Sequence, residues 1–322
     1  MRRLAPLLRL LVGVGILAAL VARLGTGAVL DGVRAIDTGS VLAALGIGLL
    51  TTVFSAWRWC LVARGLGLRL PLAAAVADCY RAVFLNSVLP AGVLGDVHRG
   101  VNHGRAAGDV GRGVRAVVLE RVAGLLVLVV VGVSVLVAQP TLLAATAVDL
   151  VPGPVITVGM FAVLAAALGF GVMAVRGERA SWLHKAVRTG LADVRTGVCS
   201  LGTWPGVVML SLATLAGYLA LFVVAARASG SHAALGELLP LLVLGLLAMG
   251  LPLNVGGWGP REAVTTVAFG AVGFGATQGL TVAVAYGTLS LISCLPGLGV
   301  LLLRRPISRC PVPPPATRVA EC

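Results

Sequence analysis

The chain has 322 residues, of which 58% are hydrophobic and only 11% charged, whereas an average soluble domain carries about 25% charged residues. So few charged side chains cannot cover a water-soluble globule, which excludes an ordinary cytosolic domain. The net charge of +13 does not indicate nucleic-acid binding, because no basic stripe with interleaved aromatic residues accompanies it. Arginines that orient membrane helices account for the same excess of positive charge.

Several apolar segments are long enough to cross a bilayer as helices. They cover roughly 5–24, 38–57, 116–138, 154–176, 204–226 and 278–303. About 20 apolar residues match the ~30 Å hydrocarbon core, and in lipid the backbone must form its hydrogen bonds internally. We therefore predict an all-α polytopic membrane bundle, with a single transmembrane domain at 1–303 and a Pro-rich, disordered cytoplasmic tail at 304–322.

The arginines also predict how the bundle is oriented, because loops rich in Arg and Lys face the cytoplasm. By this rule the N-terminus, the tail and the loop after the second span are cytoplasmic, that loop being marked by Arg58, Arg64 and Arg69. The loop 139–153 has no Arg or Lys and is predicted to lie outside. The Arg-rich, Lys-poor composition is typical of GC-rich bacteria. We thus predict a multi-pass protein of a bacterial plasma membrane with both termini cytoplasmic.

Two further apolar segments, 71–100 and 237–276, are interrupted by residues that end helices. These residues are Pro90, Gly92 and Gly95 in the first segment and Pro252, Gly256, Gly257 and Gly259 in the second. Cytoplasmic arginines flank the first segment on both sides, which predicts a re-entrant helix pair. The second segment is either a re-entrant pair from the opposite face or two short spans, so the total is six to eight crossings.

The two interruptions share the pattern L-P-x4-G-x3-R. It runs from Leu89 to Arg99 in the first segment and from Leu251 to Arg261 in the second. Paired interrupted helices in corresponding halves of a membrane protein indicate the binding site of a transporter. If the two pairs enter from opposite faces, the halves form an inverted repeat.

Charged residues lie near both interruptions and early in the third span. They are Asp96, Arg99, Glu120, Arg121, Arg261 and Glu262. A charge at bilayer depth costs roughly 2.5–3.5 kcal/mol, so we expect these residues to pair with one another around a wet cavity. The alternative is that they lie at the inner interface and extend to water. Because Pro260 suits the first turn of a helix, the adjoining N-terminus and Arg261 could together bind a phosphate or carboxylate.

No pattern in the sequence predicts a cofactor, a metal or a nucleophile. The spacing of His98 and His103 suits no metal pair on a helix, no P-loop lysine is present, and no G-x-S-x-G elbow occurs. We expect no cofactor and no nucleic-acid partner. Trp57, Trp59 and Trp204, near the ends of predicted spans, are interpreted as anchors at the membrane interface.

The order of these features matches a known family. The matching pieces are Arg58-Trp59, Asn86-x3-Pro90-x-Gly92-x2-Gly95-Asp96-x2-Arg99, Glu120-Arg121 and Pro252-x3-Gly256-Gly257-x-Gly259-x2-Glu262. Over about residues 5–303 the chain resembles the lysylphosphatidylglycerol synthase transmembrane-region family. The resemblance implies a membrane domain that flips aminoacylated phosphatidylglycerol. In such relatives a cytoplasmic aminoacyl-transferase domain follows, which we expect to be absent here.

We therefore expect a flippase-like translocase for an anionic or modified phospholipid or a lipid-linked precursor. Its substrate-binding residues would be Arg99, Arg261, Asp96, Glu120, Arg121, Glu262 and Asn86. The arginines would hold an anionic headgroup, and the carboxylates would neutralise them when the site is empty. One alternative is a membrane scaffold whose partner is a cytoplasmic glycosyltransferase. Another is a membrane enzyme that uses Glu120 or Glu262 as a general acid or base.

Overall fold

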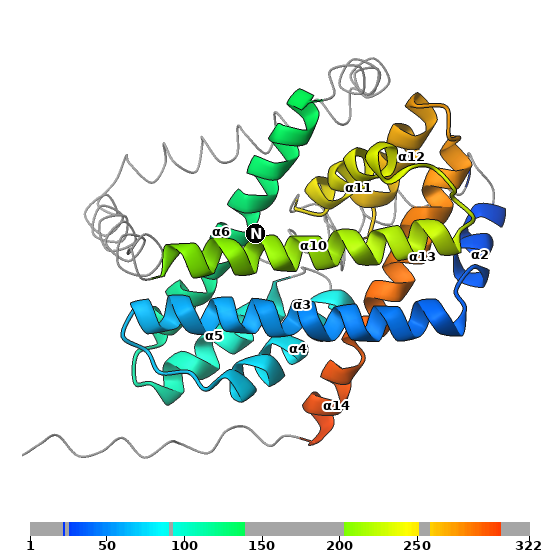
Figure 1. Cartoon of the computed structure of the whole chain (residues 1–322). Coiled ribbons are helices and arrows are strands. Elements are labelled where there is room, and N and C mark those ends of the chain that lie inside the picture. The colour runs from blue at the N-terminus through cyan, green and yellow to red at the C-terminus, as the bar shows by residue number, and fades with distance from the viewer. Residues whose placement is uncertain (1–21, 23–25, 90–92, 139–202, 251–257, 304–322) are drawn as a thin grey trace, which may run out of the picture.

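The protein is helical throughout the residues that its computed structural model describes, which are 22, 26–89, 93–138, 203–250 and 258–303 (Figure 1). This confirms the predicted all-α class. The helices are α2 (Gly27–Arg34), α3 (Thr38–Gly65), α4 (Leu72–Val88), α5 (Leu94–Ala106), α6 (Val110–Ala138), α10 (Trp204–Ala228), α11 (Leu235–Met249), α12 (Pro260–Ala271), α13 (Ala276–Cys294) and α14 (Pro296–Leu303). Apart from residue 22, the predicted spans 5–24 and 154–176 and the tail 304–322 lie outside the described residues.

Within the described part of the chain, four helices are long and apolar enough to cross a membrane. They cover Thr38–Gly65, Val110–Val135, Trp204–Ala228 and Ala276–Leu303, the last comprising α13 and α14. At 1.5 Å per residue, even 25 residues extend about 37 Å, which exceeds the ~30 Å hydrocarbon core. These helices confirm the predicted spans that begin at residues 38, 116, 204 and 278.

Helix α3 begins at a reciprocal cap and ends later than the sequence predicted. The Ser40 amide donates to Asp37 Oδ1 at 2.8 Å, and the Asp37 amide donates to Ser40 Oγ at 3.0 Å, so two amides without a helical partner are satisfied. The helix continues to Gly65 rather than stopping at residue 57. Arg58 therefore lies inside the bundle, and its assignment to a cytoplasmic loop was wrong.

Each interrupted segment forms a pair of short helices that returns to the side where it began. In the first pair, a Cβ atom built on Gly67, just before α4, would lie 3.9 Å from Arg112 Nη1 at the start of α6. In the second pair, Gln278 Nε2 at the start of α13 donates to the Ser229 carbonyl at the end of α10 at 2.7 Å. Helices α11 and α12, with 15 and 12 residues, extend only about 22 and 18 Å. Both are too short to span, which favours the re-entrant alternative.

Glycines let the helices of the first half pack at backbone contact. A Cβ atom on Gly95 would overlap the backbone of Ala82, which places α5 directly against α4. Gly104 and Gly113 bring α5 equally close to α6, because a Cβ atom on Gly113 would lie 2.5 Å from Gly104 Cα. The predicted helix-breaking glycine Gly95 thus also sets the distance between the two short helices.

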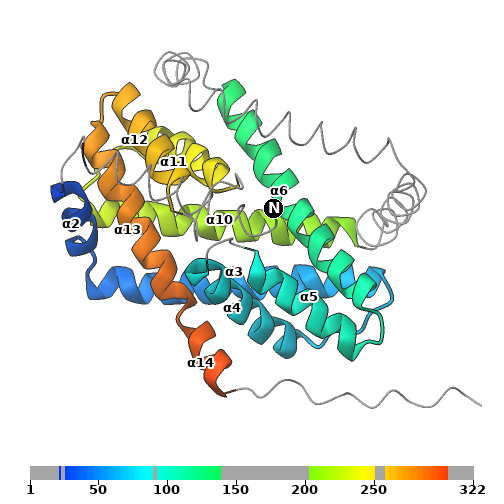
Figure 2. The ribbon, with the colours of Figure 1, turned by 180° about the vertical axis from the view of Figure 1, so that it is seen from behind.

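Within the described residues, α3–α6 and α10–α13 form two sets of four helices whose spacing and contacts fit the predicted inverted repeat (Figures 1 and 2). The helices of the second half begin 166, 163, 166 and 166 residues after their counterparts. Helices α3 and α10 are antiparallel, since Thr51 packs on Gly217 whereas Arg58, further along α3, bonds Ser211. The contacts between the halves come in matching pairs. Helix α3 contacts α13, and its counterpart α10 contacts α6. Likewise α4 contacts α13, and its counterpart α11 contacts α6. Thr51 and Gly217 are separated by the same 166 residues and contact each other, so a pseudo-two-fold axis that relates the two sets would pass near them.

We expect Gly95→Ala to destabilise the protein by roughly 1–3 kcal/mol, the usual effect of overpacking. The added methyl group has backbone rather than a movable side chain in its way. Thermal unfolding in detergent measures the effect, and Gly46→Ala is the control because nothing lies within 4 Å of a Cβ atom there. Equal melting temperatures for the two variants would contradict the close packing of α4 and α5.

Candidate functional site

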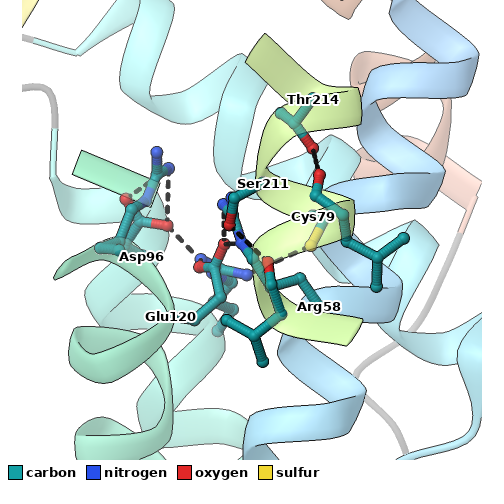
Figure 3. A network of polar contacts seen from close by, with 10 residues as sticks. Arg58, Cys79, Asp96, Glu120, Ser211 and Thr214 are labelled. Carbon is teal, nitrogen blue, oxygen red and sulfur yellow. Dashed lines mark hydrogen bonds and ion pairs between the residues drawn. The ribbon is translucent and has the colours of Figure 1, made fainter. Parts of the chain in front are cut away.

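A buried ion-pair network surrounds the carboxylate of Glu120 on α6, as Figure 3 shows. Glu120 Oε1 accepts from Nε of Arg58 at 2.9 Å and also from its Nη2. Glu120 Oε2 accepts from Arg99 Nη2 at 2.6 Å. One carboxylate therefore joins a guanidinium from α3 to a guanidinium from α5. All three side chains are buried, so solvent screens their attraction little.

Asp96, near the start of α5, extends this network to the interruption between α4 and α5. Its carboxylate accepts from Arg99 Nε at 2.9 Å and forms an ion pair with Arg121 Nη2 at 2.8 Å. Asn86, near the end of α4, donates to Asp96 Oδ2 at 2.9 Å and accepts from the Gly95 amide at 2.8 Å. Asn86 thus ties the two short helices together across their interruption.

The remaining donors of the two buried arginines also have partners. Arg58 Nη1 donates to Ser211 Oγ on α10 at 3.0 Å, and Arg99 Nη1 contacts Cys79 Sγ on α4 at 3.2 Å. The Arg99 guanidinium carbon lies 4.7 Å from the ring centroid of Trp59. Such cation–π contacts stabilise a desolvated cation. Trp59 is fully buried, so its interpretation as an interfacial anchor was wrong, whereas Trp57 and Trp204 are exposed.

The network carries one positive charge in excess. Three guanidiniums, from Arg58, Arg99 and Arg121, face two carboxylates, from Asp96 and Glu120. The neighbouring Asp78–Arg81 pair on α4, 3.4 Å apart, adds no net charge. Charge without a counter-ion is costly in a poorly solvated interior.

A cavity of about 60 Å³ lies against this network, between the two halves of the repeat. Charged groups of Asp96, Arg99, Glu120 and Arg121 line one part of it. Hydroxyl groups line another part, from Thr51, Thr52, Ser55, Tyr218, Ser290 and Ser293, and apolar side chains such as Ile47, Val83 and Leu221 complete the lining. Thr51 and Gly217, which mark the pseudo-two-fold axis, are both in the lining. In this conformation the cavity has room for only a few water molecules, since one water needs about 10–15 Å³ of such space.

A second charged cluster lies in the other half, away from this cavity. Arg261 Nε donates to Glu262 Oε1 at 3.1 Å, and the Gly259 amide donates to Glu262 Oε2 at 2.7 Å. Gly259 has φ 107°, a left-handed conformation that glycine adopts most easily. The Arg261 guanidinium lies 5.0 Å from the ring of Tyr286 and 5.2 Å from that of Trp258. Arg261 is therefore paired within its own half.

The structure thus divides the predicted site residues into two groups. Four of them, Asp96, Arg99, Glu120 and Arg121, line the cavity, and Asn86 contacts Asp96. Arg261 and Glu262 pair with each other and do not line it. The helix-breaking residues Pro90, Gly92, Pro252, Gly256 and Gly257 lie outside the described residues. Among the residues that are described, no three His, Cys, Asp or Glu side chains gather closely enough to hold a metal ion.

Sequence reasoning missed three contacts of the network. Arg58 was assigned to a loop, and Cys79 and Ser211 were given no role. A signal for Arg58 was present, because no glycine or proline interrupts α3 between Arg58 and Gly65. The apolar residues that continue past Arg58 therefore left room for a longer span that contains it.

A comparison with protein families finds one match over most of the chain. The model described as "Lysylphosphatidylglycerol synthase TM region" matches residues 7–297. Neither the curated proteins nor the solved structures contain a significant match.

We expect Glu120→Gln to destabilise the protein by roughly 3–5 kcal/mol, because it leaves Arg58 and Arg99 buried with too little negative charge. Unfolding in detergent measures the loss. The control is Asp109→Asn, which breaks an exposed ion pair with Arg112 and should cost at most about 1 kcal/mol. If the two variants were equally stable, Glu120 could not be the centre of the network.

Proposed function

The chain belongs to the lysylphosphatidylglycerol synthase TM region family, and from this premise we propose that it moves a lipid with an anionic headgroup between the leaflets of the membrane. The substrate class comprises anionic or aminoacylated phospholipids and anionic lipid-linked precursors. The family itself supports only a membrane protein of lipid-related processes. The support for translocation comes from the charged network beside the cavity.

The excess positive charge beside the cavity is the observation that carries this proposal. Arg58, Arg99 and Arg121 outnumber the carboxylates of Asp96 and Glu120 by one. A phosphate would supply the missing negative charge, and its oxygens match the forked donors of a guanidinium. Because the cavity lies at the interface of an inverted repeat, it is also placed where such folds bind their substrates.

The position of Arg121 supports a lipid rather than a water-soluble anion. Its side chain is 49% exposed although it lines the cavity and pairs with Asp96. Arg121 is the twelfth residue of its candidate span, about 17 Å from the first residue, and Val118 and Val122 on the same flank of α6 are also exposed. A headgroup could therefore reach the cavity sideways while its acyl chains stay in the hydrocarbon.

The same groups suggest how a headgroup is held. In the empty protein, Asp96 and Glu120 neutralise most of the positive charge. A phosphate that binds Arg121 and Arg99 competes with these carboxylates for the same donors. The released carboxylates could then accept a hydrogen bond from an ammonium group, such as that of an aminoacylated headgroup. No nucleotide-binding motif is recognisable in the sequence, so we expect a gradient or the consumption of the transferred lipid to drive the transfer.

Proteoliposomes with headgroup-labelled lipids test the proposal. We expect phosphatidylglycerol to cross faster than phosphatidylcholine with the wild-type protein. Arg121→Gln should slow this transfer at least about tenfold, since one charge-assisted hydrogen bond contributes about 1.5–3 kcal/mol. The matched control is Arg112→Gln, because Arg112 on the same helix is 45% exposed and also pairs with an aspartate, at 3.3 Å.

Transfer no faster than in protein-free vesicles, with folded protein and with both a membrane potential and a pH gradient applied, would contradict translocation and favour the scaffold. Equal transfer of the two lipids would contradict the anionic specificity. Equal loss in Arg121→Gln and Arg112→Gln would show that surface charge, not the cavity, governs the rate.

A further inference from the structure

The two halves have the same order of helices, but a cavity lies beside the charged cluster of only one of them. In the first half the charged cluster lines a cavity. In the second half Arg261 and Glu262 are almost completely buried, and the cavity does not reach them. The clusters of both halves are buried, and only the first lies beside a cavity. A protein that alternates between two states would show this difference in one of them.

The clusters occupy equivalent places in their halves. Helices α5 and α12 each carry an acid at the third residue, Asp96 and Glu262, and each acid pairs with an arginine of its own helix. Both arginines lie near an aromatic ring, Arg99 at 4.7 Å and Arg261 at 5.2 Å. Arg261 comes one turn earlier in its helix than Arg99 does. The sixth position, which holds Arg99 in α5, holds Thr265 in α12.

The hydroxyl group of Thr265 lacks a hydrogen-bond partner in this conformation. Its side chain is fully buried at 0% exposure, and its Oγ1 has no hydrogen-bond partner. The same is true of Oγ1 of the adjacent Thr266. Buried hydroxyls without partners are rare, and a ligand that entered this part of the bundle would supply one.

Exchanging the conformations of the two halves provides that state. The pseudo-two-fold axis passes near Thr51 and Gly217, which also line the cavity, so the rotation that relates the halves is centred on the cavity itself. A shift of one half against the other would close the cavity beside Arg99. It would open an equivalent cavity beside Arg261, using the exchangeable contacts between the halves.

We propose that Arg261, Glu262 and Thr265 form a second headgroup site, which opens to the opposite face of the membrane when the Arg99 site closes. Its ligand is the phosphate of the same lipid, with Arg261 and the Thr265 hydroxyl as donors. This inference rests on the proposed function for the identity of the ligand. The alternation of the two sites can be measured without any lipid transfer.

Thiol accessibility from each face tests the alternation. One variant keeps Cys79, which lines the first cavity, as its only cysteine, and a second carries Thr265→Cys as its only cysteine. A membrane-impermeant thiol reagent is added to either side of oriented vesicles. We expect Cys79 to react from the cytoplasmic side and Thr265→Cys from the other side. Ala225→Cys, equally buried in α10 but outside both clusters, is the control and should stay at least tenfold less reactive.

Reaction of Thr265→Cys at the rate of Ala225→Cys, or from the same side as Cys79, would overturn the second site. So would a Cys79 that reacts from neither side. If Thr265→Cys does not fold, Thr266→Cys replaces it, because Thr266 is also buried with an unpartnered hydroxyl. Lipid transfer with a protected Thr265→Cys would refute this inference alone, whereas opposite-sided reactivity without transfer would refute only the translocase.

Discussion

A carboxylate shared by two guanidiniums decides much of this fold. Inside a bundle with so few polar groups, an arginine without a counter-ion would be expelled or would draw water in after it. Glu120 on α6 holds Arg58 of α3 and Arg99 of α5 at once, so these three helices are fixed around one anion. The re-entrant pair α4–α5 can stay in the bundle because Asp96 and Asn86 continue the same network across its interruption.

This pairing is incomplete in a way that bears on function. Two carboxylates cannot neutralise three guanidiniums, and the least buried of these, that of Arg121, is the one at the edge of the cavity. The excess charge lies where the two halves of the bundle meet.

The sequence predicted the parts of this structure that follow from local composition. Proline and glycine inside apolar runs predicted both helix pairs, and the cost of charge in a membrane predicted that Asp96, Arg99, Glu120 and Arg121 would meet. Arg58 and Trp59 were misplaced because a hydropathy profile treats an arginine as the end of a span. The profile contains no information about the glutamate 62 residues later that pairs with Arg58. The separation of Arg261 from the first cavity was also beyond the sequence, because it depends on the antiparallel packing of α3 and α10.

Retention of lipid by the purified protein tests the anion site most directly. Native mass spectrometry would compare phosphatidylglycerol with phosphatidylcholine bound to the wild type, to Arg99→Gln and to the surface variant Arg112→Gln, at one salt concentration. We expect the wild type and Arg112→Gln to retain phosphatidylglycerol in preference to phosphatidylcholine, and Arg99→Gln to lose that preference. Equal retention of phosphatidylglycerol by Arg99→Gln and the wild type would contradict an anion site at the buried network.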